Sequence, residues 1–136
     1  MIIVIDTNIL IDFARSSRVK KEEILWPRLV SFAKREGHQL VLPTIALFEL
    51  FSGNEMKVVS NREKTENILK DVVVLDLNEE IAKKGASLFR QYQANVGPID
   101  YILAATTFIL KGELATLNPK HFSIFKELSL FNLSKL

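Results

Sequence analysis

The chain has 136 residues, of which 48% are hydrophobic and 25% are charged, and its net charge is +2 at pH 7. These values are typical of a soluble globular protein, and the length suits a single domain over residues 1–136. There is no cysteine, which excludes disulfides, thiolate metal sites and a cysteine nucleophile. The small net charge does not require a nucleic-acid partner. We find no signal peptide and no apolar run long enough to span a bilayer, so we expect a cytoplasmic protein.

The start of the chain has the pattern of a buried strand followed by a helix. Residues 2–5 read Ile-Ile-Val-Ile, which is typical of a central parallel strand covered on both faces. Asp6, Thr7 and Asn8 follow, and then apolar residues at helical spacing, so either Thr7 or Asn8 is expected to cap a helix. Asp6 would then lie at the carboxyl end of a strand, where open α/β sheets bind ligands. A role as a helix N-cap alone would account for Asp6 equally well.

The rest of the chain alternates helical stripes with short apolar runs. Helices are predicted from about Trp26 to Gly37 and at residues 44–52, 63–69, 79–95 and 98–110, with a loop or short helical link at 55–62. Strands are predicted at residues 39–42, 72–75 and 114–117, with a possible last edge strand at 128–130. This alternation indicates an α/β protein, a three-layer α/β/α sandwich with a short, mostly parallel central sheet.

Two further carboxylates stand in apolar surroundings. Glu49 is the only charged residue between Pro43 and Gly53, and its helical neighbours are small or apolar. Burying an unpaired carboxylate is costly, so Glu49 either has a partner or reaches water at the edge of its helix. Asp100 lies in the first turn of the helix that begins at Pro98. The helix dipole alone could explain that position.

Together, these three acids suggest a metal site. Each lies near the end of a buried element, and converging carboxylates repel one another unless a positive charge sits between them. The three segments contain no lysine or arginine near the acids that could fill this role. A hard divalent cation such as Mg²⁺ or Mn²⁺ prefers oxygen ligands, whereas zinc favours histidine and cysteine. Such an ion could activate water and neutralise charge on a phosphate.

Four stretches of the chain carry a family resemblance, and they read IIVIDTNILID (2–12), PTIALFEL (43–50), DYILAA (100–105) and ATLNPKHF (115–122). In order, spacing and flanking residues they resemble the PIN-domain nucleases, and among these the VapC-like toxin ribonucleases of type II toxin–antitoxin systems. The resemblance implies an α/β/α sandwich, an acidic pocket for Mg²⁺ or Mn²⁺, and hydrolysis of RNA. It further implies a homodimer and inhibition by a small antitoxin protein.

The same resemblance implies roles for individual residues. Asp6, Glu49 and Asp100 would bind the metal, with Thr7 or Asn8 supporting them and Thr116 near the site. Asn118 would assist catalysis, but family members often have an acid there and a second acid where this chain has His121. An asparagine brings no charge, so we expect one metal ion, or a second one recruited with the substrate. His121 would contact a substrate phosphate or order the turn.

Other residues carry weaker expectations. A basic cluster of Arg15, Arg18, Lys20 and Lys21, with Lys57, Arg62 and Lys64, could contact an RNA backbone or be only a solvated surface. The aromatic residues Trp26, Phe48, Phe51 and Phe89 are expected in the core or at an interface rather than as platforms for base stacking.

Three functions fit these observations. The first is a metal-dependent endoribonuclease in which metal-held water attacks a phosphodiester in line. The second is a non-catalytic PIN-like module that binds RNA or protein and has lost a charge at Asn118. The third, ranked last, is a phosphoacceptor switch domain, because Lys111 and Lys120 are poorly placed for that chemistry.

Overall fold

A computed structural model of the chain describes residues 1–15 and 23–136. Within this part, four parallel strands form one sheet in the order β3-β2-β1-β4. The strands are β1 (Ile2–Ile5), β2 (Gln39–Pro43), β3 (Val73–Leu75) and β4 (Glu113–Ala115). The helices are α1 (Thr7–Arg15), α2 (Leu25–Glu36), α3 (Thr44–Phe51), α4 (Val59–Ile68), α5 (Glu79–Tyr92), α6 (Pro98–Leu110) and α7 (Pro119–Phe122). Short 3-10 turns lie at Asn54–Lys57, Leu69–Asp71 and Leu133–Lys135.

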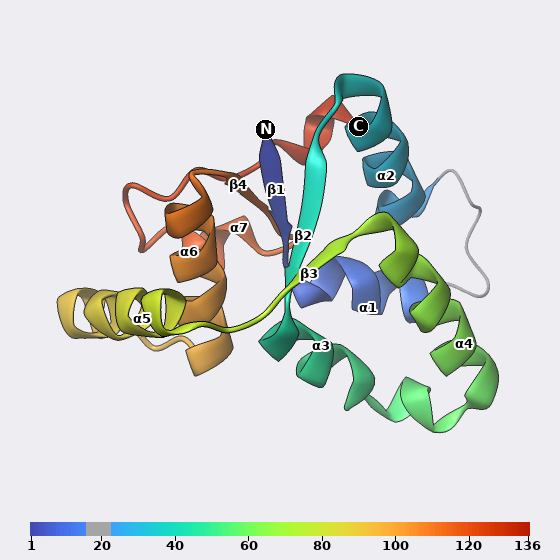
Figure 1. The fold of residues 1–136 in the computed structure, drawn as a ribbon, viewed down its shortest axis with the longest axis horizontal. Coiled ribbons are helices and arrows are strands. Elements are labelled where there is room, and N and C mark those ends of the chain that lie inside the picture. Colours follow the sequence, from blue (N-terminus) through green and yellow to red (C-terminus); the bar gives the residue numbers. More distant parts are fainter. Residues whose placement is uncertain (16–22) are drawn as a thin grey trace.

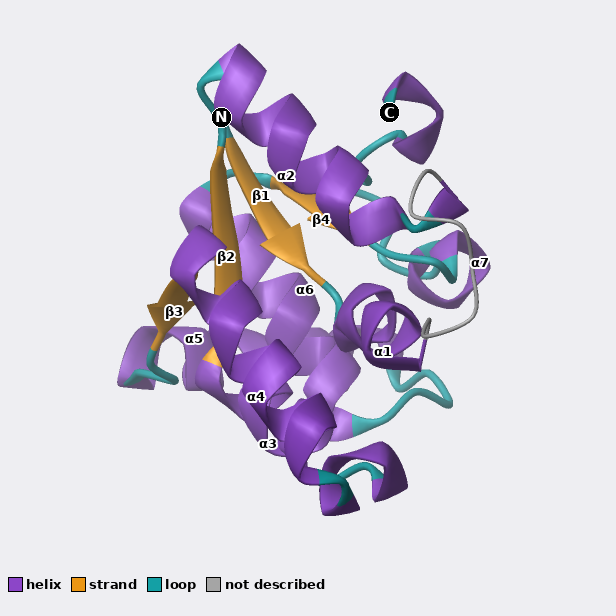
Figure 2. Ribbon diagram, turned by 90° about the vertical axis from the view of Figure 1, so that its right-hand side faces the viewer, coloured by secondary structure: helices purple, strands orange, loops and turns teal. Residues whose placement is uncertain are grey.

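Helices cover both faces of the sheet, which makes the predicted three-layer sandwich (Figures 1 and 2). Side chains alternate between the two faces along a strand, and β1 shows this clearly. Ile3 and Ile5 belong to the core beneath α1, α2 and α3, whereas Val4 belongs to the core beneath α5 and α6. All three side chains are fully buried, which explains why β1 reads as an uninterrupted apolar run.

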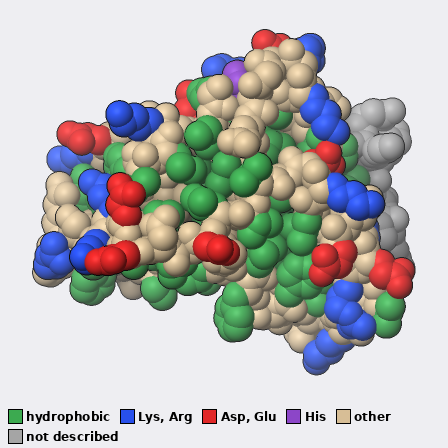
Figure 3. All heavy atoms as spheres, viewed as in Figure 1, with side chains coloured by type: hydrophobic (Ala, Val, Ile, Leu, Met, Phe, Trp, Pro, Cys, Tyr) green, Lys and Arg blue, Asp and Glu red, His purple; other side chains and the backbone are tan. Residues whose placement is uncertain are grey.

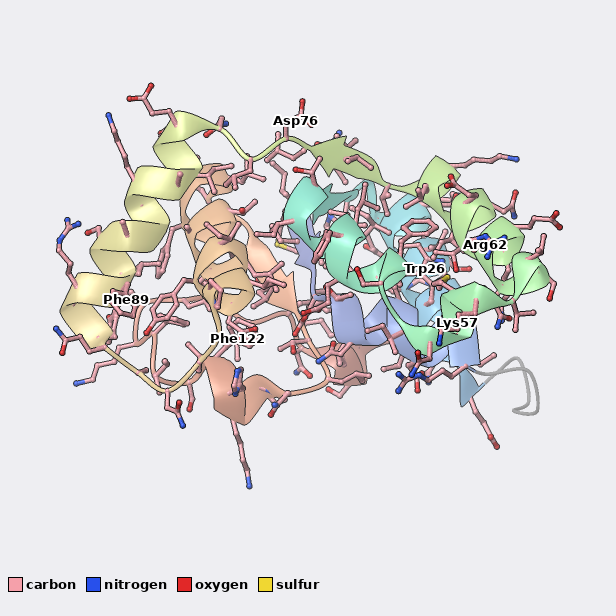
Figure 4. All side chains as sticks on the ribbon, turned by 90° about the horizontal axis from the view of Figure 1, so that it is seen from below. Trp26, Lys57, Arg62, Asp76, Phe89 and Phe122 are labelled. Atoms are coloured by element: carbon pink, nitrogen blue, oxygen red, sulfur yellow. The ribbon has the colours of Figure 1, made fainter. Side chains whose placement is uncertain are left out.

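Because all four strands are parallel, their carboxyl ends meet at one edge of the sheet. β1 is a central strand that pairs with β2 on one side and with β4 on the other. The chain leaves β1 at Asp6, β2 at Thr44 and β4 at Thr116, so these three residues follow neighbouring strand ends. This shared edge, called the carboxyl edge below, faces downward in Figure 1 and toward the viewer in Figure 4.

Most predicted elements are confirmed, and β1 and α6 have the predicted bounds. The predicted strand at 128–130 is wrong, because only an isolated bridge joins Leu130 to Leu114. The chain then turns away through the 3-10 turn at Leu133–Lys135, so no ladder develops. Helix α4 begins at Val59 rather than Glu63, because Asn61 and Arg62 bind backbone carbonyls of the preceding 3-10 turn and so hold the helix start.

None of the helices described here is both long and apolar enough to cross a membrane.

Gly112 is required where β4 approaches β1. A Cβ atom at this position would lie 2.5 Å from the carbonyl oxygen of Ile2, and the backbone of β1 cannot move away without disturbing the sheet. We therefore expect Gly112→Ala to lower the free energy of unfolding by about 1–3 kcal/mol, measured by urea denaturation.

Gly53→Ala is the matched control. A Cβ atom there would clash with a carboxylate oxygen of Glu55, which is the end of a flexible side chain. The loss should therefore be smaller than for Gly112→Ala, and equal losses would contradict this explanation.

Candidate active site

Asp6 is the buried centre of the carboxyl edge. Asp6 as a whole residue is only 7% exposed. The Thr116 hydroxyl donates a hydrogen bond of 2.7 Å to its Oδ2 atom, and the backbone N–H of Asn8 donates another to its carboxylate. Helix α1 begins at Thr7, immediately after Asp6. Asp6 therefore takes the N-cap position that we expected Thr7 or Asn8 to take, and its carboxylate also lies at the strand end.

A small network joins the ends of β1 and β4 around Asp6. The Asn8 side chain donates to the Thr116 hydroxyl oxygen at 3.3 Å and accepts from the backbone N–H of Leu117 at 3.2 Å. The same hydroxyl oxygen accepts from the backbone N–H of Asn118 at 3.0 Å. Since Thr116 accepts from two donors, its own proton is directed at Asp6. The network thus fixes the orientation of the buried carboxylate.

Of the supporting residues that the resemblance implied, Asn8 and Thr116 join this network through their side chains, whereas Thr7 and Asn118 do not. The Thr7 hydroxyl is buried but has no hydrogen-bond partner among the described residues. Asn118 is exposed and enters the network through its backbone, and its side chain makes no capping hydrogen bond to α7. The Asn118 amide therefore remains accessible at the rim of the site.

Asp100 reaches the site from α6 and is held by two contacts through one oxygen. Its Oδ2 atom accepts from the backbone N–H of Gly97 at 3.3 Å, as in a capping box. The same atom lies 2.7 Å from Nε2 of His121, which comes from α7. The two side chains are 22% and 35% exposed, respectively. These contacts leave Oδ1 of Asp100 as the oxygen free to meet a ligand.

Two negative charges act on the buried carboxylate of Asp6. Burial raises the pKa of Asp6 above its ordinary value of 3.8, and the negative charges of Asp100 and, more weakly, Glu49 act in the same direction. The hydrogen bonds from Thr116 and from the Asn8 backbone oppose this increase. Glu49 itself is half-buried on α3. The fold therefore places Asp100 and Glu49 near enough to Asp6 for their charges to reach it, without gathering the three acids into a cluster.

The chemistry of these donors fits a hard divalent cation. Carboxylate oxygens from three separate elements repel one another, and a cation between them would remove that repulsion. As they stand, however, no three His, Asp or Glu side chains in the described residues are close enough together to hold a metal ion. Binding would therefore require the carboxylates to turn inward.

Several of the basic residues proposed to contact RNA are engaged within the chain. Lys64 donates to the backbone carbonyl of Phe13 at 2.8 Å, and its ammonium lies 4.2 Å from the centre of the Phe13 ring. Arg62 donates to the carbonyl of Met56 at 2.6 Å, and Arg15 pairs with Glu55 at 3.4 Å. Lys64 thus joins α4 to α1, whereas Arg62 and Arg15 join these two helices to the 3-10 turn at Asn54–Lys57. Arg18, Lys20 and Lys21 lie outside the described residues.

The aromatic residues divide into two groups. Trp26 and Phe51 belong to the core or pack against it, as expected. Phe48 and Phe89 are 73% and 56% exposed and are not core residues. Figure 4 shows Phe89 on α5, at one end of the molecule, with Lys57 and Arg62 at the other. The sequence did not show that Phe48 would be exposed, nor that His121 would contact Asp100, because both depend on how distant elements pack.

Comparison with known proteins connects this site to a family. The family model of the PIN domain matches residues 3–128. Among curated proteins, ribonuclease VapC10 of Mycobacterium tuberculosis is 31% identical over 129 residues, covering 93% of this chain and 90% of the relative. Ribonuclease VapC19 of the same organism is 28% identical over 127 residues, covering 91% of this chain and 94% of the relative.

Solved structures show the same fold. The VapBC2 complex from Rickettsia felis, bound to a promoter DNA fragment, contains a chain that matches with a TM-score of 0.80 at 20% identity, covering 97% of this chain and 98% of that one. VapBC-1 from nontypeable Haemophilus influenzae matches with a TM-score of 0.74 at 23% identity, covering 98% and 99%.

The raised pKa of Asp6 predicts how stability depends on pH. The ionised carboxylate is disfavoured in the folded chain, so at neutral pH it lowers the free energy of unfolding. That loss is recovered as the pH falls through the folded-state pKa toward the ordinary value of 3.8. We therefore expect Asp6→Asn to be more stable than the parent chain at pH 7 without divalent metal, with the difference shrinking toward pH 4.

Urea denaturation across this pH range, with chelator present, measures the effect. Asp12→Asn, which alters an exposed acid on the same helix, is the control and should show no such gain. A parent chain as stable as Asp6→Asn at pH 7 would contradict the prediction.

Proposed function

Because the chain belongs to the PIN-domain family, we propose that it is an endoribonuclease that hydrolyses RNA phosphodiesters with the help of Mg²⁺ or Mn²⁺. The observation that carries this proposal is the buried carboxylate of Asp6, whose pKa is raised by burial and by the charges of Asp100 and Glu49. The curated relatives of the chain are named ribonucleases, and their matches cover most of it.

Asp6, Glu49 and Asp100 would hold the metal ion. When bound, the ion supplies positive charge that neutralises a phosphate and lowers the pKa of a water molecule. The chain's own residues arrange the acids for this task, since Thr116 and the Asn8 backbone fix Asp6 and His121 fixes one oxygen of Asp100. Asn118 offers an amide at the rim that can orient water or substrate without adding charge, which favours a single tightly held ion.

A non-catalytic binding module is the second candidate. It is favoured by the neutral Asn118 and by the spacing of the acids, which do not form a ready metal cluster within the described residues. The two candidates differ in what metal does. A nuclease needs it for cleavage, whereas a binding module retains its affinity for RNA or protein in its absence.

Two partners follow from the same proposal. Structural neighbours are toxin–antitoxin complexes, and we propose that this chain is a toxin paired with a small antitoxin protein. We also propose a homodimer, which is supported by exposed apolar residues of β3 and the turn after it, Val73, Val74 and Leu77. Figure 3 shows the side of the molecule on which β3 lies, and hydrophobic side chains gather over its middle. An apolar patch of this kind is typical of protein interfaces.

Cleavage of a mixed transfer and ribosomal RNA pool tests the function. The purified chain should yield discrete fragments with Mg²⁺ or Mn²⁺ and none with chelator. Asp6→Asn and Asp100→Asn should each reduce cleavage by about 100-fold or more, because charge stabilisation at the reacting phosphate is lost. Circular dichroism checks that both variants fold, and Asp12→Asn serves as the control. Full activity of either site variant at equal metal concentration would refute the assignment.

His121 is expected to act through Asp100. Removing it in His121→Ala frees Oδ2 of Asp100 to rotate, and we expect the apparent Mn²⁺ affinity to fall about 10- to 100-fold, as for other partners that orient metal ligands. His121→Gln, which keeps a donor, should restore part of this loss. Titration of cleavage against Mn²⁺ measures the effect, with Lys120→Ala as the neighbouring exposed control. A loss of rate with unchanged Mn²⁺ affinity would show that His121 acts otherwise.

A further inference from the structure

Two exposed apolar side chains belong to the segments that carry Glu49 and Thr116 to the carboxyl edge. Phe48 is 73% exposed, the highest value among the large hydrophobic side chains that the structure describes, and Leu117 is 41% exposed. Each is the sequence neighbour of a residue at the site, since Phe48 precedes Glu49 and Leu117 follows Thr116. Neither side chain helps to form the core, so their positions call for a separate explanation.

The geometry of α3 places Phe48 on the outer side of the helix that carries Glu49. The helix buries Ala46 and Leu50, which lie one turn apart on a single face. At 3.6 residues per turn, Phe48 points away from that face, and Glu49 lies on the flank between the two. Glu49 is close enough to Asp6 to act on its charge. The flank of α3 that reaches the acids therefore continues outward to the ring of Phe48.

Leu117 lies on the other side of Asp6. It follows β4, and its backbone N–H is bound by Asn8, which is two residues from Asp6. Strands β2 and β4 flank β1 in the sheet, so Leu117 after β4 and Phe48 on the helix after β2 lie on opposite sides of the strand end that carries Asp6.

Electrostatic attraction alone is a weak source of affinity for RNA here. The site carries three negative charges, and the chain as a whole is only +2. Three of the cations expected to bind a phosphate backbone, Arg15, Arg62 and Lys64, are engaged within the chain. A contact that does not depend on charge would add to the binding energy that the remaining cations supply.

Building on the proposed ribonuclease function, we propose that Phe48 stacks on a nucleobase of single-stranded RNA next to the phosphodiester held at the acids. Leu117 contacts the nucleotide on the opposite side. An aromatic ring binds the face of any base, so this contact tolerates different sequences but requires a base that is free of its own helix. The nuclease would accordingly select loops and single strands over duplexes.

Binding of a short, labelled single-stranded RNA tests this proposal without cleavage. In the Asp6→Asn background, which keeps the RNA intact, Phe48→Ala should weaken binding about 10- to 100-fold. Phe48→Trp and Phe48→Tyr should retain affinity, whereas Phe48→Leu, which is apolar but not aromatic, should not. The dependence of affinity on salt should stay unchanged, because no ionic contact is lost. Phe89→Ala, which removes an exposed ring from α5, is the matched control.

Abasic substitution identifies the stacked nucleotide. Removing the base at one position of the RNA should weaken binding to the parent chain. The same removal should have no effect on binding to Phe48→Ala, because the ring on which that base stacks is already gone and the two losses are not additive. Unchanged affinity in Phe48→Ala would overturn the proposal. A second outcome would also overturn it. If light scattering gives a smaller molecular mass for Phe48→Ala, and Phe48→Leu restores both the mass and the affinity, then Phe48 lies at an interface between copies of the chain.

The proposed function and this inference can fail separately. With Asp6 intact, Phe48→Ala should raise KM for single-stranded RNA while leaving kcat nearly unchanged. If the parent chain cleaves no RNA under any metal condition, the ribonuclease proposal fails, but the binding comparison still decides the role of Phe48. If cleavage is robust and indifferent to Phe48, only the stacking contact is refuted.

Discussion

A carboxylate buried at the end of the central strand is the constraint on which the rest of the site depends. Taking a charge out of water is costly, and at Asp6 two nearby negative charges add to that cost. The chain offsets part of it with the hydroxyl of Thr116 and the N-terminus of α1. An apolar side chain here would avoid that cost, and the proposed metal site would explain why the charge is kept.

The parallel sheet explains how acids far apart in sequence reach this position. Asp6 follows β1 directly, and Glu49 lies on the helix that follows the neighbouring strand β2. Asp100 lies in the first turn of α6, which packs against the face of β1 that carries Val4. Each acid is thus placed by a rigid element rather than by a loop. His121 then joins α7 to the first turn of α6 through Asp100.

Local sequence patterns were sufficient where burial is uniform along an element. The Ile-Ile-Val-Ile run of β1 and the Pro-started, apolar α6 have the predicted bounds, because nearly every side chain in them faces a core. The pattern failed at residues 128–130, where two leucines separated by Ser129 meet the sheet at a single bridge. It also failed at the start of α4, where exposed Val59 gives no helical stripe and polar contacts set the boundary.

The candidate site was only partly readable from the sequence for a related reason. An acid in an apolar context can be recognised locally, and this singled out Asp6, Glu49 and Asp100. The bond from Thr116 to Asp6 and the contact of His121 with Asp100 join residues that are distant in sequence, and no local pattern encodes them.

Phe48 is a residue whose exposure the sequence pattern did not predict. Its helical spacing is that of a core residue, yet the buried face of α3 is set by Ala46 and Leu50 on the opposite side. A short helix with apolar residues all round cannot bury them all against one sheet. Whichever apolar side chain points away from the sheet remains available for a ligand, and on α3 that side chain stands one residue from an acid of the site.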